Sequence, residues 1–309
     1  MVSKNSSQNL EYVPLTDDLL FHMVFTKNKK ALHSLLSCLL NIPEKDIVDT
    51  IILNPMQFSE SFDMNLSILD LKLHLNGEIY ILVEMQVRRF IHWPKRTLVY
   101  ACRQIAEQDK GKDFDYSSIQ PVIQIAIMDH TLFPDHRRFI SKYTLKDNEG
   151  YQYTDALQFI VMDLTAIDLA DSQNRVVELV EWAKAFKAKD WNSIEKIGNS
   201  GVKEAMKTME TIMATPSERE MILLRRKAEN DRREEYNNAR AQGLAEGRAE
   251  GRAEGRAEGR AEGRAEGRAE GESRLSKLLL KLYASGRSDD AMRCLSDSEF
   301  RSILFKELL

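Results

Sequence analysis

The sequence predicts a mixed α/β fold, a small sheet with flanking helices, followed by a helical C-terminal region with a long repeat helix. Apolar residues alternate with polar ones through residues 66–87, which is typical of a β-hairpin. Short, mainly apolar runs at 119–128 and 157–164 are typical of buried strands. Apolar residues recur at helical spacing on both sides of these segments, so helices and strands share one chain.

The first predicted element is a helix over residues 16–40, interrupted near residues 27–30. Thr16 is a candidate N-cap. Asp18 falls in the first turn, where an acidic side chain interacts favourably with the helix dipole. A first strand is expected within residues 46–58.

The hairpin at residues 66–87 is predicted to bury its odd-numbered side chains. Side chains alternate across a strand, and both strands of a hairpin must bury the same face. The odd positions are apolar, whereas Asp70, Glu84 and Gln86 fall on the opposite, otherwise polar face. Three polar side chains thus share one side of the hairpin.

The turn decides which of these residues meet. A two-residue turn at the central Asn-Gly pair would put the apolar faces on opposite sides. We therefore expect a three-residue loop over residues 75–77 with a bulge, which pairs His74 with Glu78. In this register Asp70 lies diagonal to Glu84.

Asp70 and Glu84 are candidate metal ligands, because two carboxylates from adjacent strands can hold Mg²⁺ or Mn²⁺. Such an ion can polarise a phosphodiester and lower the pKa of an attacking water. Gln86, on the same face, can orient that water or a phosphate but carries no charge. The alternative is an ordinary solvated strand face.

A helix is predicted from about Pro94 to Asp109, with the proline suited to its first turn. Arg96, Tyr100 and Gln104 are spaced i, i+4, i+8 and share one face of this helix. They could approach a phosphate or the Glu84 carboxylate together, or form an exposed polar stripe. Further along the chain, a helix is expected over residues 176–186, with its Trp182 side chain in the protein core.

Taken in order, these motifs resemble the PD-(D/E)XK nuclease superfamily, in particular its bacterial family of recombination-promoting nucleases and putative transposases. The likeness covers nearly the whole chain and rests on an N-terminal Asp-x-x-Phe helix, a strand aspartate, a Glu-x-Gln strand and a following Arg, Tyr, Gln helix: Asp18 to Phe21, Asp70, Glu84 to Gln86, and Arg96, Tyr100 and Gln104. Two departures are His22, where the family commonly has lysine, and Gln86, where the superfamily has its catalytic lysine.

The resemblance implies a restriction-endonuclease-like αβββαβ core and a metal-dependent endodeoxyribonuclease, a Mg²⁺-dependent hydrolase of DNA phosphodiester bonds that promotes recombination or is associated with mobile elements. It implies catalytic roles for Asp70, Glu84 and Gln86 and accessory roles for Asp18, Arg96, Tyr100 and Gln104. The competing hypothesis is a catalytically inactive DNA-binding or oligomerisation protein on the same fold.

Composition adds weaker constraints. A formal net charge of −4 over 309 residues is no nucleic-acid signature, so DNA contact needs a local basic rim, for which Lys72, Arg88 and Arg89 are the candidates. The three cysteines lack disulfide or zinc spacing and sit in apolar helical patterns, which predicts reduced structural thiols. Without an apolar leader or a membrane-length apolar run, we expect a cytoplasmic protein with no membrane partner.

Four regions are expected: a nuclease core at 1–165, a helical region at 166–242, a repeat helix or spacer at 243–271, and a small helical element at 272–309. In the third region glycine recurs every fourth residue, eight times, and Arg-Ala-Glu-Gly occurs six consecutive times. Each glycine costs a helix about 1 kcal/mol relative to alanine. Either a parallel homodimer along a Gly or Ala seam supports this helix, or the repeat is a tolerated flexible spacer.

Overall fold

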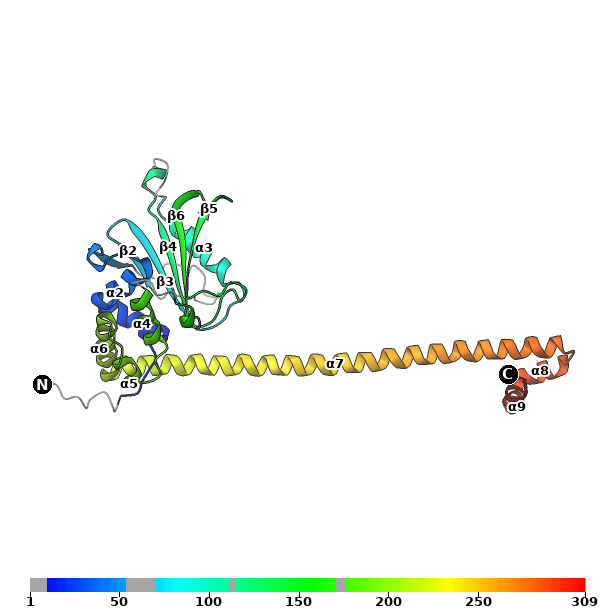
Figure 1. The fold of residues 1–309 in the computed structure, drawn as a ribbon. Coiled ribbons are helices and arrows are strands. Elements are labelled where there is room, and N and C mark those ends of the chain that lie inside the picture. Colours follow the sequence, from blue (N-terminus) through cyan, green and yellow to red (C-terminus); the bar gives the residue numbers. More distant parts are fainter. Residues whose placement is uncertain (1–9, 54–70, 110, 112–114, 171–175, 309) are drawn as a thin grey trace. The chain divides into compact units, whose positions relative to one another are not determined.

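The computed structural model describes residues 10–53, 71–109, 111, 115–170 and 176–308 (Figure 1). These residues form two compact units, Met1–Arg226 and Lys227–Leu309. The first unit holds the sheet and the helices that pack on it, and the second holds the repeat and the C-terminal helices.

The first unit is built on a six-stranded mixed sheet with the order β1-β2-β3-β4-β6-β5. Strands β1 to β3 are antiparallel, β3, β4 and β6 are parallel, and β5 runs antiparallel to β6. The strand bounds are β1 Thr50–Leu53, β2 Leu71–Leu75, β3 Ile79–Gln86, β4 Val122–Met128, β5 Ile140–Lys146 and β6 Gln152–Asp163. The predicted α/β fold class is confirmed, with the expected order of helix, three strands, helix and strand.

The hairpin register differs from the expected one by two residues. His74 pairs with Tyr80 instead of Glu78, and the three loop residues are 76–78. Asn76 and Gly77 both have positive φ, 52° and 71°, as a type I′ turn requires. Glu78, which follows them, is the additional loop residue before the strands pair at Leu75 and Ile79. The Asn76 side chain accepts from the amides of residues 48 and 49 and so fixes the turn from outside the hairpin.

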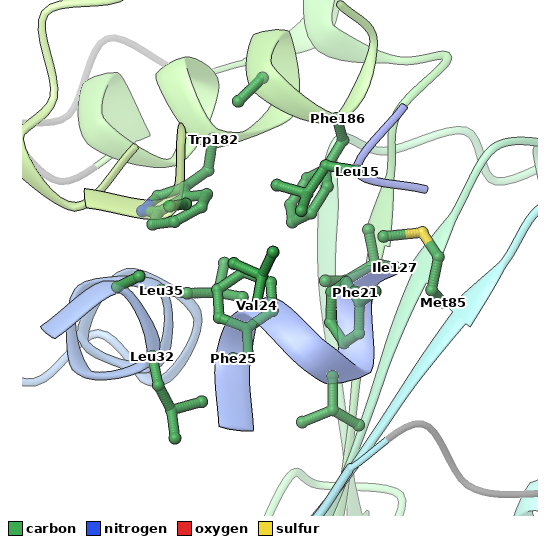
Figure 2. Close-up of a cluster of buried hydrophobic side chains, with 14 of the residues drawn as sticks. Leu15, Phe21, Val24, Phe25, Leu32, Leu35, Met85, Ile127, Trp182 and Phe186 are labelled. Carbon is green, nitrogen blue, oxygen red and sulfur yellow. The ribbon is translucent and has the colours of Figure 1, made fainter. Parts of the chain in front are cut away.

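The odd-numbered hairpin face packs against helices. Helices α1 (Asp18–Lys27), α2 (Lys29–Leu40) and α4 (Val176–Phe186) share one hydrophobic core with it. Figure 2 shows Phe21 of α1 beside Met85 of β3 and Ile127 of β4. Trp182 is fully buried in this core, as predicted. The shift of two residues in register leaves this burial intact because it preserves the parity of the strands.

The N-terminal helix is two helices, with the break inside the predicted interruption. Asn28 ends α1 and caps α2 by accepting from the Ala31 amide. The N-cap of α1 is Asp17 and not Thr16, since the Asp17 carboxylate accepts from the Leu20 amide. A carboxylate at this position also interacts favourably with the helix dipole.

The opposite sheet face is covered by α3 (Trp93–Ala106), whose first turn contains Pro94 as expected. Strand β5 was not predicted from the sequence, because this edge strand is mostly half-exposed and lacks an apolar run. The described residues of this unit also form α5 Trp191–Glu195, α6 Ser200–Ala214 and short 3₁₀ turns at Glu44–Asp46, Tyr116–Ser118 and Ile167–Leu169.

One helix, α7 (Pro216–Ala284), begins in the first unit and contains the whole repeat in the second, where residues 243–271 are exposed along it. Helices α8 (Ser288–Ser296) and α9 (Ser298–Leu308) pack on the end of α7 around Leu278, Leu282 and Leu304. Cys38 and Cys294 are buried, but Cys102 is exposed, so its prediction as a structural thiol is wrong. In the part of the chain that the structure describes, none of the helices combines the length and the apolar composition of a transmembrane segment.

Candidate active site

Glu84 lies near the end of β3, on the sheet face that α3 covers. Only 3% of the residue is exposed, so for Glu84 the alternative of a solvated strand face is wrong. The reason is α3, whose Ala101 packs with Leu82 of β3 and Val122 of β4. The face that carries Glu84 is therefore part of a second, smaller core.

The Glu84 carboxylate is poorly satisfied by its surroundings. Neither of its oxygens has a hydrogen-bond partner among the described residues. Arg96 supplies a positive charge close by, since its Nη2 lies 3.6 Å from Glu84 Oε2. Burial raises the pKa of Glu84, and the charge of Arg96 opposes that rise. A buried carboxylate with free lone pairs suits a hard cation that restores the lost solvation.

Arg96 connects Glu84 to Gln86. Its Nη2 donates to Gln86 Oε1 at 3.5 Å, and its guanidinium lies over the rings of Phe90 and Tyr100. Gln86 in turn donates from Nε2 to the Arg88 carbonyl at 2.6 Å, which fixes the amide orientation. The side chain of Arg96 is 28% exposed, so the guanidinium bridges the buried site and solvent.

Arg96, Tyr100 and Gln104 share one face of α3, as predicted, and this face packs toward the sheet. The alternative interpretation, in which they form an exposed polar stripe, is therefore wrong. Tyr100 packs on the cluster around Leu82, and Gln104 is 3% exposed with no hydrogen-bond partner for its Oε1 among the described residues.

Sequence reasoning missed Gln124, which sits in β4 between Leu82 and Phe159 on the same sheet face. It is 1% exposed, and among the described residues neither its amide oxygen nor its amide nitrogen has a hydrogen-bond partner. The signal was present as one polar residue inside an apolar run, and a buried amide of this kind normally has a partner or marks a functional site.

The predicted DNA-contact residues divide into two groups. Lys72 is 3% exposed, and its ammonium pairs with Glu107 at 3.0 Å, so it belongs to the interior. Arg88 and Arg89 are exposed in the segment that connects β3 to α3. They remain available to a phosphate backbone.

Asp18 and His22 lie on α1, which packs on the other face of the sheet. The Asp18 carboxylate forms an ion pair with Arg225, a contact that joins the start of α1 to the start of α7. His22 is half-buried.

Asp70 lies outside the described residues, which resume at Leu71. Within the described part of the chain, no three His, Cys, Asp or Glu side chains gather as a metal site. The donors that fit a cation there are the Glu84 oxygens, which accept no hydrogen bond from the described residues and whose chemistry matches Mg²⁺ and Mn²⁺.

Comparison with known proteins identifies a family. A family described as PD-(D/E)XK nuclease family transposase matches residues 15–239, about three quarters of the chain. No curated protein matches the chain. No solved structure matches it.

Proposed function

The chain belongs to the PD-(D/E)XK nuclease family transposases, and we propose that it is a Mg²⁺-dependent DNA endonuclease, with Mn²⁺ as an alternative ion. The observation that carries this proposal is Glu84, a buried carboxylate whose oxygens lack hydrogen bonds among the described residues and which faces one arginine. By its family, the enzyme would serve DNA recombination or a mobile element.

Asp70 and Glu84 are the proposed metal ligands. The β2–β3 ladder is described as far as the pair Leu71 and Val83. Asp70 precedes Leu71 and Glu84 follows Val83, so one further step of an antiparallel ladder would join these two positions. Directly opposed side chains share a sheet face with Cβ atoms about 5 Å apart, which is suitable for binding one ion.

When bound, the ion supplies a Lewis acid and a water of lowered pKa. Gln86, held by the Arg88 carbonyl, orients this water or a phosphate oxygen through its remaining amide atoms. Arg96 places a positive charge beside both residues and stabilises negative charge that develops on the phosphate. Arg88 and Arg89 hold the flanking backbone.

Nicking of supercoiled plasmid in Mg²⁺ tests this function. We expect Asp70→Ala and Glu84→Ala to abolish nicking, and Glu78→Ala, an exposed carboxylate on the same hairpin, to retain it. Circular dichroism checks that the variants fold. Nicking that persists in both folded site variants would refute the proposal. Plasmid binding without nicking in the wild type would favour the inactive DNA-binding or oligomerisation protein.

We also propose that α7 pairs with a second copy in parallel. In the repeat, identical residues recur every fourth position, so no Glu and Arg meet at i, i+4 within one helix. A Gly or Ala seam allows close approach, and a parallel pair brings Glu rows beside Arg rows. Sedimentation should show a dimer that becomes a monomer when residues 243–271 are deleted. A monomer at all concentrations, with or without the repeat, would exclude the pairing.

A further inference from the structure

An open cavity of about 210 Å³ lies beside the candidate active site, between the first turns of α3 and the sheet edge formed by β6 and β5. Its walls come from four elements: α3, the segment after β4, β5 and β6. The lining residues that matter are Trp93, Leu98, Phe133, Tyr143, Phe159 and Val161.

The lining is almost entirely apolar and rich in aromatic rings. Phe133 and Tyr143 meet edge to face with their centroids 6.2 Å apart. Trp93 is buried against Val161, and Phe133 is 37% exposed at the rim. Flat apolar walls of this kind accept a planar ring by stacking, which tolerates any of the four bases.

The cavity is on the same side of the sheet as the candidate metal ligand. Val161 of β6 pairs with Ala126 of β4, and Ala126 pairs with Glu84 of β3. Two interstrand spacings correspond to about 10 Å. A strand stacked as in B-DNA advances about 3.4 Å per nucleotide, so a base within a few nucleotides of the scissile phosphate can reach the cavity.

The charges around the cavity favour a nucleic acid as its occupant. The connecting segment that leads into α3 carries exposed Arg88 and Arg89, and the first turns of α3 carry exposed Lys95 and half-buried Arg96. Cations that follow a phosphate backbone beside an aromatic slot are the combination used to bind single-stranded nucleic acid.

We propose that this cavity, hereafter the base pocket, binds an unpaired nucleobase of the DNA substrate. The proposal rests on DNA being the substrate, as proposed above, and adds that this DNA carries an unpaired or extruded base. Extrusion is cheapest at a bulge or mismatch, so the enzyme should prefer such DNA to a perfect duplex.

Two tryptophan substitutions on α3 test the base pocket. Leu98 lines the pocket and is 44% exposed, whereas its neighbour Val99 is 47% exposed and does not line it. Full-length wild type, Leu98→Trp and Val99→Trp are titrated in Ca²⁺ with two fluorescent duplexes. One has a single-nucleotide bulge of 2-aminopurine, and the other is the same duplex fully paired.

We expect the wild type and Val99→Trp to bind the bulged duplex about fivefold tighter or more than the paired one, with quenched 2-aminopurine fluorescence. Leu98→Trp should lose both the preference and the quenching. Equal affinities in the wild type, or a preference that survives in folded Leu98→Trp, would overturn the proposal. Should Leu98→Trp fail to fold, Phe133→Ala decides by the same comparison, since it removes one stacking ring.

Binding and cleavage can fail independently. A bulge preference that is lost only in Leu98→Trp, together with plasmid nicking that is unchanged in Glu84→Ala, would support the base pocket and refute the catalytic site. Nicking that depends on Glu84, with no bulge preference, would do the reverse.

Discussion

Arg96 Nη2 lies 3.6 Å from Glu84 Oε2 and forms an ion pair with this glutamate, of which only 3% is exposed. The guanidinium also reaches Gln86 and solvent. One arginine therefore balances the charge of the buried Glu84 carboxylate and is positioned to contact a phosphate.

Replacing Arg96 should separate metal binding from catalysis. In Arg96→Gln the positive charge that competes with a divalent ion for Glu84 is gone, so Mg²⁺ affinity should be unchanged or higher. Nicking should nevertheless fall by about tenfold to a thousandfold, because a charge that stabilises the transition state is lost. Calorimetry and plasmid nicking measure the two effects. Arg103→Gln, an exposed position on the same helix, is the control, and equal loss in both variants would contradict this role.

Neutralising Glu84 should stabilise the metal-free protein. Burial raises the pKa of Glu84 above its usual 4.5, so at pH values between the unfolded-state and folded-state pKa the folded protein binds more protons than the unfolded chain. Wild-type stability should therefore fall as pH rises from the unfolded-state pKa through the higher folded-state pKa, and this contribution should be absent in Glu84→Gln.

At pH 8 in EDTA we expect Glu84→Gln to be more stable by on the order of 1 kcal/mol, about 2–4 °C in Tm. Added Mg²⁺ should raise the Tm of the wild type and leave that of the variant unchanged. Thermal unfolding across pH checks both. A variant less stable than the wild type at pH 8 would show that the ionised carboxylate is well satisfied.

Gly201 predicts a steric limit at the crossing of α2 and α6. A Cβ added there would meet the Oγ and Cβ atoms of Ser34 at 2.2 and 2.3 Å. Gly201→Ala should therefore lower stability by about 1–3 kcal/mol. At Gly198 the added Cβ would meet only the end of the flexible Glu181 side chain, at 3.1 Å, so Gly198→Ala should cost less. Denaturant unfolding of both variants compares them, and equal costs would contradict the crowding at Ser34.

The sequence correctly predicted which side chains share a face of a strand or helix, but it did not predict the hairpin register or which face α3 covers. Alternation in the hairpin assigned the buried odd face, and the spacing of Arg96 and Gln104 assigned one helix face, since both follow from local periodicity. The hairpin register depended on the Asn76 side chain, which bonds to a segment about 30 residues earlier in the chain. The burial of Glu84, Lys72 and Gln124 depended on α3 lying over the sheet, and local spacing carries no information about which helix covers which face.

The glycines of the repeat give the last prediction. A Cβ added at any of the eight positions from Gly243 to Gly271 would have nothing within 4 Å in a single chain. Replacing all eight with alanine should therefore stabilise α7 by about 1 kcal/mol per position, and its helical signal should persist to higher temperature in circular dichroism. Serine at the same eight positions is the control, because serine also has a Cβ but has a lower helix propensity than alanine. If the helices pair through a glycine seam, alanine should weaken the dimer in sedimentation while it strengthens the helix. A more stable helix with unchanged dimerisation would show that the helices do not pair through the glycine seam.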